Sequence, residues 1–244
     1  MFTTLLIVVL VGAALGLMGG FLILWKEDFA RKLSLYFVAF ASGTLLAAAF
    51  LDLIPEGIGS SGLRASMFSV LLGFLVFMIL EKFLAWYHCH GGECEFHDRP
   101  TYVYTIIIGD TLHNFVDGIA IAVSFMINIE LGLATAIAVF AHELPQEIGD
   151  FGVLLHAGIS RAKVAWYNVV SALATPLGAV LGYSLGNFFG QIEGLILAFI
   201  AGTFIYVGAS DLIPHLHKEW RWKRSLWHVL LMIIGILVIA LVVH

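Results

Sequence analysis

Residues 113–118, His-Asn-Phe-Val-Asp-Gly, and residues 142–147, His-Glu-Leu-Pro-Gln-Glu, each lie near the middle of a long apolar stretch. An ionisable side chain at the centre of a bilayer costs about 2.5–3.5 kcal/mol on insertion scales. Several such groups at one depth therefore need a partner of opposite charge. Imidazole, carboxylate and amide groups form a nitrogen and oxygen ligand set that suits a divalent transition metal. The two clusters predict a metal site inside a membrane.

The composition is that of a membrane protein. Of 244 residues, 61% are hydrophobic and 12% are charged, whereas soluble domains carry about 25% charged residues. The net charge of −5 is small and scattered, so we expect no nucleic-acid partner. The first four residues lack the basic region of a cleavable signal peptide, and the first apolar run is expected to remain as a span.

Apolar stretches long enough to cross a bilayer, about 20 residues or more, predict an all-α membrane protein with eight transmembrane helices. The expected helices are Leu5–Trp25, Leu33–Ile54, Leu63–Tyr87, Tyr102–Met126, Leu131–Ala157, Val164–Phe189, Ile192–Ile213 and Leu226–Val243. No linker rich in Pro or Ser interrupts them. We therefore expect residues 1–244 to form a single transmembrane domain.

The basic residues predict how the chain crosses the membrane. With the N-terminus outside, the inner loops contain eleven of the twelve Lys and Arg residues, and the outer loops contain only Arg64. This is a strong positive-inside bias. We expect a multi-pass protein of the cell membrane, surrounded by lipid, with both termini extracellular or periplasmic. The oligomeric state stays open, a homodimer included.

Spans 1–3 resemble spans 6–8. The segments 52–55 and 211–214 both read Asp-Leu-Ile-Pro, and 43–44 and 202–203 both read Gly-Thr, at one offset of 159 residues. Because the displacement is five spans, an odd number, the copies must cross the membrane in opposite directions. Inverted repeats are typical of transporters with a substrate site near the midplane. The sequence predicts a 3+2+3 arrangement, with repeats at 5–87 and 164–243 and two central helices at 102–157.

The polar residues of each central span fall on one helical face, at spacings of three and four. The first stripe is Asp110, His113, Asn114 and Asp117, and the second is His142, Glu143, Gln146, Glu147 and Asp150. His113 and His142 each follow their predicted helix start by 11 residues, a depth of about 16 Å at 1.5 Å per residue. Pro145 should distort the second helix. Two facing stripes can hold one or two ions.

Three other interpretations use the same residues. The polar groups could only hold helices together, although such contacts rarely need carboxylates in hydrocarbon. An intramembrane zinc metalloprotease would use a degenerate HExxH motif, but Gln146 stands where the second His is required. A metal-gated channel would use these ligands without alternating access, whereas the inverted repeat favours a carrier. We expect a carrier and no enzyme activity.

The motifs resemble those of the ZIP (Zrt/Irt-like) family of divalent-metal transporters. The stretches that carry the resemblance are Gly109-Asp110-x-x-His113-Asn114-Phe115-x-Asp117-Gly118, then His142-Glu143-x-Pro145-x-Glu147-x-Gly149-Asp150-Phe151, and Ala201-Gly202-Thr203-Phe204-x-Tyr206. They are similar to helices four, five and seven of the family. The family has eight spans in an inverted 3+2+3 arrangement with both termini outside, so the resemblance covers the whole chain.

The resemblance implies a transport site for one or two metals between spans 4 and 5, with Zn²⁺, or Cd²⁺, Fe²⁺ or Mn²⁺, moving into the cytoplasm. One metal would bind His113, Asp117, His142 and Gln146, and a second would bind Asn114, Asp117, Glu143 and Gln146. Two features depart from the family. Gln146 replaces a usual His, which should favour harder ions, and span 6 lacks the carboxylate that some relatives place there.

The remaining polar residues outline a route through the membrane. Asp52 ends span 2 on the outer side, where it would collect the ion. Inward of the central site lie Asp110, Glu147, Asp150, Asp211, His215 and His217. Glu81, near the end of span 3, is expected to be interfacial.

The inner loop, residues 88–101, is rich in His and Cys. Its candidate metal ligands are His88, Cys89, His90, Cys94 and His97. Two Cys separated by four residues do not have a zinc-finger spacing, and a reducing compartment disfavours a disulfide. We expect a loop that receives or senses metal.

Overall fold

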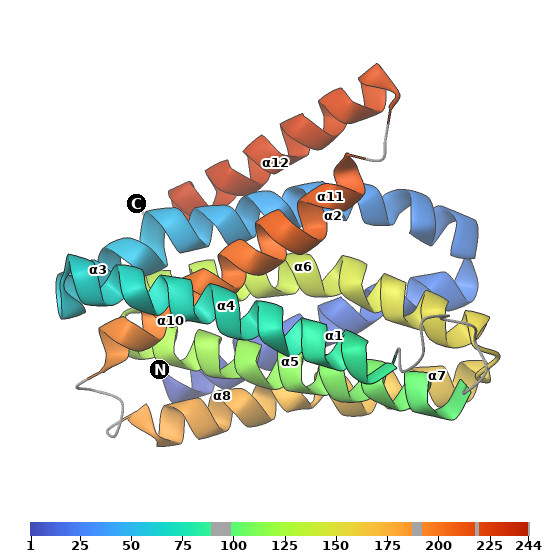
Figure 1. Cartoon of the computed structure of the whole chain (residues 1–244), viewed down its shortest axis with the longest axis horizontal. Coiled ribbons are helices and arrows are strands. Elements are labelled where there is room, and N and C mark those ends of the chain that lie inside the picture. Colours follow the sequence, from blue (N-terminus) through green and yellow to red (C-terminus); the bar gives the residue numbers. More distant parts are fainter. Residues whose placement is uncertain (89–98, 187–191, 218–219, 244) are drawn as a thin grey trace.

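The computed structural model describes residues 1–88, 99–186, 192–217 and 220–243. Helices account for nearly all of these residues, and no strand occurs among them. The predicted all-α class is therefore confirmed. Figure 1 shows long helices that lie side by side in a bundle, with the polypeptide crossing it repeatedly.

The helices subdivide several of the predicted spans. In chain order they are α1 (Phe2–Trp25), α2 (Glu27–Ala47), η1 (Ala48–Leu53), α3 (Ile54–Ser61), α4 (Leu63–His88), α5 (Arg99–Ile127), α6 (Ile129–His156), α7 (Arg161–Ala172), α8 (Ala174–Ser184), α10 (Glu193–Ile205), η2 (Tyr206–Leu212), α11 (Ile213–Leu216) and α12 (Trp222–Val243). The two η segments are π-helical turns. Predicted spans 2 and 7 each comprise an α-helix, a π-turn and a further α-helix, and span 6 comprises α7 and α8.

Seven stretches of the described residues are long and apolar enough to cross a membrane. They are Phe2–Trp25, Glu27–Ser61, Leu63–Phe83, Ile106–Ile127, Arg161–Ser184, Glu193–Leu216 and Trp222–Val242. They correspond to seven of the eight predicted spans. The eighth is α6, which has 28 residues and is long enough to span, at about 42 Å for 1.5 Å per residue. Its central polar residues lower its hydropathy.

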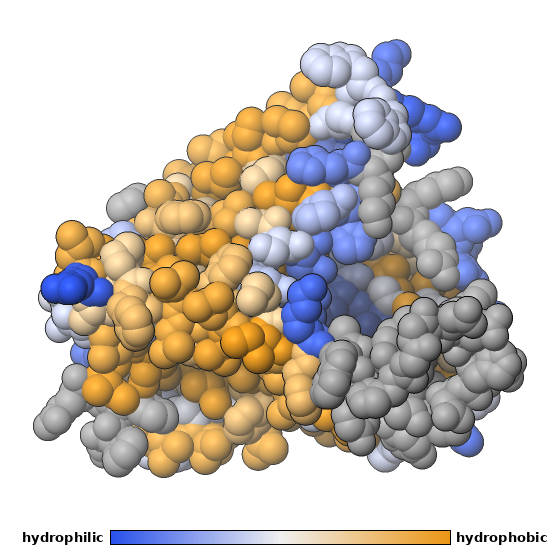
Figure 2. All heavy atoms as spheres, in the orientation of Figure 1, coloured by the Kyte–Doolittle hydropathy of each residue, from blue (hydrophilic) through white to orange (hydrophobic). Residues whose placement is uncertain are grey.

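The outer surface of the bundle is apolar. In the most apolar window of α4 and of α12, only 17% of the residues are buried, against 72% in the span that contains α2. Figure 2 shows hydrophobic residues over most of the visible face, while hydrophilic residues gather toward one end. This distribution is that of a protein whose sides face lipid and whose ends face water.

Two predicted boundaries shift at the polar loop. α4 continues to His88 and α5 begins at Arg99, whereas the predicted helices end at Tyr87 and begin at Tyr102. Residues 89–98 lie outside the described part of the chain. The metal-binding role expected of Cys89, His90, Cys94 and His97, and of the His88 side chain, therefore stays a prediction.

The π-turns occupy matching positions in spans 2 and 7. η1 ends at Leu53 and η2 ends at Leu212, and these residues are related by the 159-residue offset of the sequence repeat. In both cases a proline follows at the start of the next helix. π-turns frequently mark functional sites. The π-helical turn therefore recurs at the same place in both copies of the sequence repeat. The inverted 3+2+3 topology remains a prediction.

The backbones of α5 and α8 are in close contact at Gly118. A Cβ atom on Gly118 would lie 2.0 Å from the carbonyl oxygen of Thr175, and one on Gly178 would lie 2.1 Å from that of Phe115. No side chain fits at either position, so the two backbones pack as only small residues allow. This contact fixes α8 beside the polar stripe of α5.

Candidate metal centre

A single residue, Asn128, connects α5 to α6 and sets the two polar stripes at a common depth. Its side-chain oxygen accepts a hydrogen bond from the backbone N–H of Leu131 at 2.7 Å, which caps the start of α6. So short a connection makes the helices antiparallel neighbours. α6 then runs without interruption through Pro145 to His156.

Four side chains from these two helices converge on one point. The Nε2 atoms of His113 and His142 lie 3.0 Å apart. Asp117 Oδ2 is 3.4 Å from the first nitrogen and 3.2 Å from the second, and Glu143 Oε1 is 3.7 and 3.8 Å from them. All four potential ligand atoms lie within 4.8 Å of one another.

These separations fit a tetrahedral metal. Ligands placed 2.0–2.1 Å from a zinc ion at the corners of a tetrahedron are about 3.4 Å apart. The measured distances between the imidazoles and their acidic neighbours, 3.2 to 3.8 Å, lie close to that value. A divalent ion at the centre requires only small movements of side-chain ends.

The electrostatics of the cluster favour a cation. Asp117 and Glu143 have side chains 7% exposed, and His142 is 1% exposed. Asp117 Oδ2 and Glu143 Oε1 are buried without a hydrogen bond of regular geometry. Burying ionised carboxylates is costly unless they are paired or coordinate a metal. The two carboxylate oxygens without a hydrogen bond therefore indicate that the cluster binds a cation.

His142 is held in the tautomer that a metal requires. Its Nδ1 atom lies 3.0 Å from the carbonyl oxygen of Ala138, an acceptor to which Nδ1–H donates. The lone pair of the neutral imidazole then resides on Nε2, which faces the cluster. Such an outer hydrogen bond is the usual partner of a metal-bound histidine.

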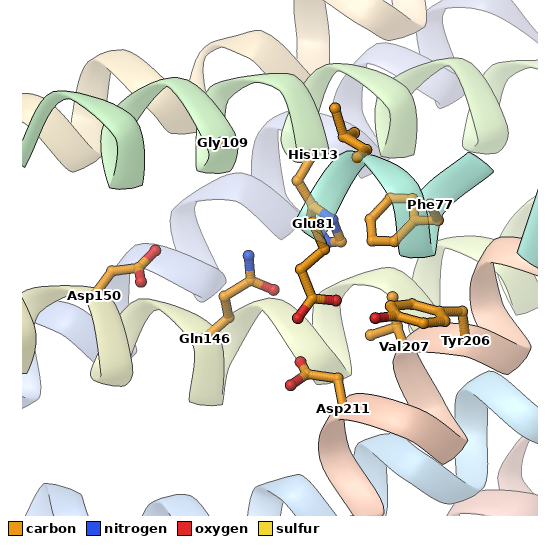
Figure 3. A pocket seen from close by; sticks show the side chains of 10 residues that line it. Phe77, Glu81, Gly109, His113, Gln146, Asp150, Tyr206, Val207 and Asp211 are labelled. Atoms are coloured by element: carbon orange, nitrogen blue, oxygen red, sulfur yellow. The ribbon is translucent and has the colours of Figure 1, made fainter. Parts of the chain in front are cut away.

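A cavity of about 280 Å³ adjoins the cluster. It is lined by Phe77, Leu80, Glu81, Gly109, His113, Gln146, Asp150, Tyr206, Val207 and Asp211. In Figure 3, the carboxylates of Glu81 and Asp211 reach into this space from α4 and η2, and Gln146 and Asp150 face it from α6. Glu81 and Asp211 are exposed, so the cavity connects His113 with the surface.

The structure brings together some of the predicted site residues and separates others. The histidine and acidic residues of the cluster are His113, Asp117, His142 and Glu143, and Gln146 lines the adjoining cavity together with His113. Asn114 faces α8, where its side-chain oxygen lies 2.8 Å from the Thr175 hydroxyl. Asp110 contacts Asn114 and lies outside the cluster.

Some of the predicted pathway residues line the cavity, and others lie elsewhere. Asp150 and Asp211 line the cavity. Glu147 is buried, and neither of its carboxylate oxygens has a hydrogen-bond partner. Asp52 is buried within η1 and is not among the cavity-lining residues. His215 and His217 are exposed, and His215 Nδ1 lies 2.9 Å from the carbonyl oxygen of Asp211.

The cavity also contains residues that the sequence did not assign to a site. Glu81 was expected at the interface, yet it forms part of the cavity wall and hydrogen-bonds to Tyr206. The available signal was an acidic residue inside predicted span 3, six residues before its end at Tyr87. Phe77 gave no signal, because an aromatic residue in an apolar helix is unremarkable.

Fold and cluster together define a multi-pass membrane protein with a candidate metal centre. The profile of the family described as ZIP Zinc transporter matches residues 2–94 and 88–243. The chain therefore belongs to the ZIP zinc transporter family. Members of this family are transporters and not enzymes, and the relation supports metal transport.

Individual relatives match mainly in part. Zinc transporter ZIP10 of Danio rerio is 41% identical over 137 residues, 55% of this chain and 16% of that protein. Zinc transporter ZIP4 of Homo sapiens is 43% identical over 115 residues, 47% of this chain and 18% of that protein. Zinc transporter ZIP13 of Pongo abelii is 32% identical over 223 residues, 84% of this chain and 65% of that protein. The chain covers less than two thirds of the length of each of these relatives.

Proposed function

We propose that this chain is a carrier that moves a divalent transition metal, Zn²⁺ foremost and Cd²⁺, Fe²⁺ or Mn²⁺ as further candidates, through a midplane site into the cytoplasm. The observation that carries the proposal is the convergence of His113, Asp117, His142 and Glu143 within 4.8 Å. Two imidazoles and two carboxylates replace the water shell of a dication and balance its charge.

The proposed direction follows from the cavity and the basic residues. The cavity is lined by residues from the second half of α4, the first half of α5 and the second half of α6. Basic residues concentrate toward the corresponding ends of these helices, among them Lys82, Arg99 and Arg161. By the positive-inside rule this end faces the cytoplasm, both termini face outward, and the cavity serves as the exit.

A carrier is favoured over a channel by the unequal exposure of two repeat-related carboxylates. Asp211 is exposed and lines the cavity, whereas Asp52, its counterpart at the 159-residue offset, is only 4% exposed. This difference supports a site that is open toward the side of Asp211 and closed toward the side of Asp52. We infer that residues 1–244 act as one transport domain. Its two repeats would alternate, so that the side that is now closed opens while the open side closes.

The protease alternative is not favoured. The HExxH mechanism needs both histidines on one helix, four residues apart. Here the second imidazole of the cluster comes from His113 on α5, and Gln146 occupies the position on α6 that the motif reserves for His.

The test is uptake of Zn²⁺ or Cd²⁺ into vesicles that contain the purified chain. Saturable uptake is expected, and His113→Ala or Asp117→Ala should abolish it because each removes one of four ligands. Asp28→Ala, which removes an exposed acid at the start of α2, is the matched control and should transport normally. Wild-type rates in both ligand variants would refute the central site, and peptide cleavage without ion flux would favour the protease.

A further inference from the structure

Both polar atoms of the Asn114 side-chain amide are hydrogen-bonded to protein groups. Its Nδ2 atom donates to the backbone oxygen of Asp110 at 3.1 Å and to Oδ1 of the same residue at 3.0 Å. Its Oδ1 atom accepts a hydrogen bond from the Thr175 hydroxyl at 2.8 Å. Because both Asp110 atoms are acceptors, the amide nitrogen must face Asp110 and the oxygen must face Thr175.

This arrangement turns the only metal-binding atom of Asn114 away from the cluster. The cluster lies between α5 and α6, whereas Thr175 belongs to α8. Asn114 and Thr175 are each 2% exposed and Asp110 is 6% exposed, and Asp110 also receives a hydrogen bond from Ser171 of α7. A buried polar network whose members are all paired is rigid.

The backbone contact at Gly118 holds the network in place. Since Gly118 lies against the carbonyl oxygen of Thr175, the start of α8 cannot withdraw without breaking the closest helix contact of α5. The hydroxyl of Thr175 is thereby kept over Asn114, one turn before Gly118 on the same helix.

We propose that the central site of this chain binds a single ion, and that Asn114 is a positioning residue clamped by Asp110 and Thr175 rather than a ligand of a second ion. The inference rests on the proposed transport site. The clamp fixes the turn of α5 that presents His113 and Asp117 to α6. The second metal position implied by the family resemblance loses a ligand that it requires.

The number of bound ions tests the proposal directly. The number of Cd²⁺ ions bound per chain is measured by equilibrium dialysis for the purified full chain and for the variant His113→Ala/Asp117→Ala. Subtracting the second number from the first removes ions that bind outside the central site. A difference of one ion per chain is expected. A difference of two ions would overturn the single-ion site and leave transport intact, whereas no difference would overturn the transport site itself and this inference with it.

Charge-swap variants separate positioning from coordination. Asn114→Asp still accepts from Thr175 but cannot donate to Asp110 and adds a second negative charge, so Cd²⁺ affinity should fall about tenfold. The double variant Asp110→Asn/Asn114→Asp restores one donor and one acceptor and should recover the wild-type affinity. If Asn114 were a ligand, Asn114→Asp would keep or raise the Cd²⁺ affinity, and the double variant would bind no more tightly than the single one. That result would overturn the proposal.

Thr175 provides a milder pair of variants in case the charged ones fail to fold. Thr175→Val keeps the shape of the side chain and removes the donor, and Thr175→Ser keeps the donor. Thr175→Val should weaken Cd²⁺ binding without changing the number of ions, and Thr175→Ser should bind as the wild type does. Equal affinities in the two variants would show that the hydroxyl positions nothing.

Discussion

The ring of Phe77 packs edge-on against the imidazole of His113, with centroids 5.3 Å apart and planes inclined at 69°. Phe77 belongs to α4 and His113 to α5, so this contact joins the cavity wall to the cluster of candidate metal ligands. Phe77 also contacts Tyr206 at 5.9 Å. The rings of Phe77 and Tyr206 form an aromatic wall beside His113, the cluster residue that lines the cavity.

Removing this wall should loosen the site. Phe77→Ala leaves His113 without its packing partner, and the imidazole gains rotational freedom that binding must then remove. Cd²⁺ affinity should fall about threefold to tenfold, in line with the roughly 0.5–1.5 kcal/mol of an aromatic pair. Phe68→Ala, which truncates an exposed ring on the same helix, is the control. Equal Cd²⁺ affinities in the two variants, measured by dialysis, would contradict this role.

The residue at position 146 should tune selectivity. Gln146 lines the cavity next to His113 in Figure 3, and an amide oxygen is a harder and weaker zinc ligand than an imidazole. Gln146→His should shift the preference from Mn²⁺ and Fe²⁺ toward Zn²⁺, seen as stronger Zn²⁺ competition in a Cd²⁺ uptake assay. An unchanged order of competition would show that this position does not set selectivity.

The cavity acids should govern release rather than binding. Glu81 and Asp211 lie on opposite helices between the cluster and the surface, and neither belongs to the cluster. Glu81→Gln and Asp211→Asn should each lower the maximal uptake rate several-fold while equilibrium Cd²⁺ binding stays near the wild-type value. Loss of binding in either variant would place that acid in the site itself.

The contact between α5 and α8 should be intolerant of any side chain. Gly118→Ala brings a methyl group to 2.0 Å from a backbone oxygen, and the resulting overpacking should destabilise the fold by about 3 kcal/mol. Gly59→Ala is the matched control, because nothing lies within 4 Å of a Cβ there. Thermal unfolding in detergent should show a lowered midpoint for Gly118→Ala alone, and equal midpoints would contradict the close packing.

The fold was largely predictable because apolar length and the scarcity of charge specify membrane spans. The helix interruptions were not predictable from the same signal. Hydropathy does not distinguish an α-turn from a π-turn, so η1 and η2 were missed even though the Asp-Leu-Ile-Pro repeat covers the end of each. The break between α7 and α8 at Leu173 also carries no Pro or Gly signal at that residue.

The candidate site could be predicted only as two stripes. Helical spacing places Asp110, Asn114 and Asp117 on one face, yet a stripe does not tell which members face α6 and which face α8. That choice depends on Gly118 and Thr175, which bring the two helix backbones together from 57 residues apart in the chain. Glu143, which the family resemblance assigned to a second ion, lies beside His113, Asp117 and His142, and Gln146 lines the adjoining cavity together with His113.

The length and polarity of α6 have a consequence for how the protein is made. This helix is long enough to span, but it is absent from the seven stretches whose hydropathy suffices for spanning. A segment with several carboxylates partitions poorly into lipid by itself. α6 packs against α1, α2 and α5, which all precede it in the chain. We therefore expect α6 to enter the membrane against these helices, which shield its polar face, and not as an independent segment. The residues that suit the chain for a metal thus make its own biogenesis a cooperative event.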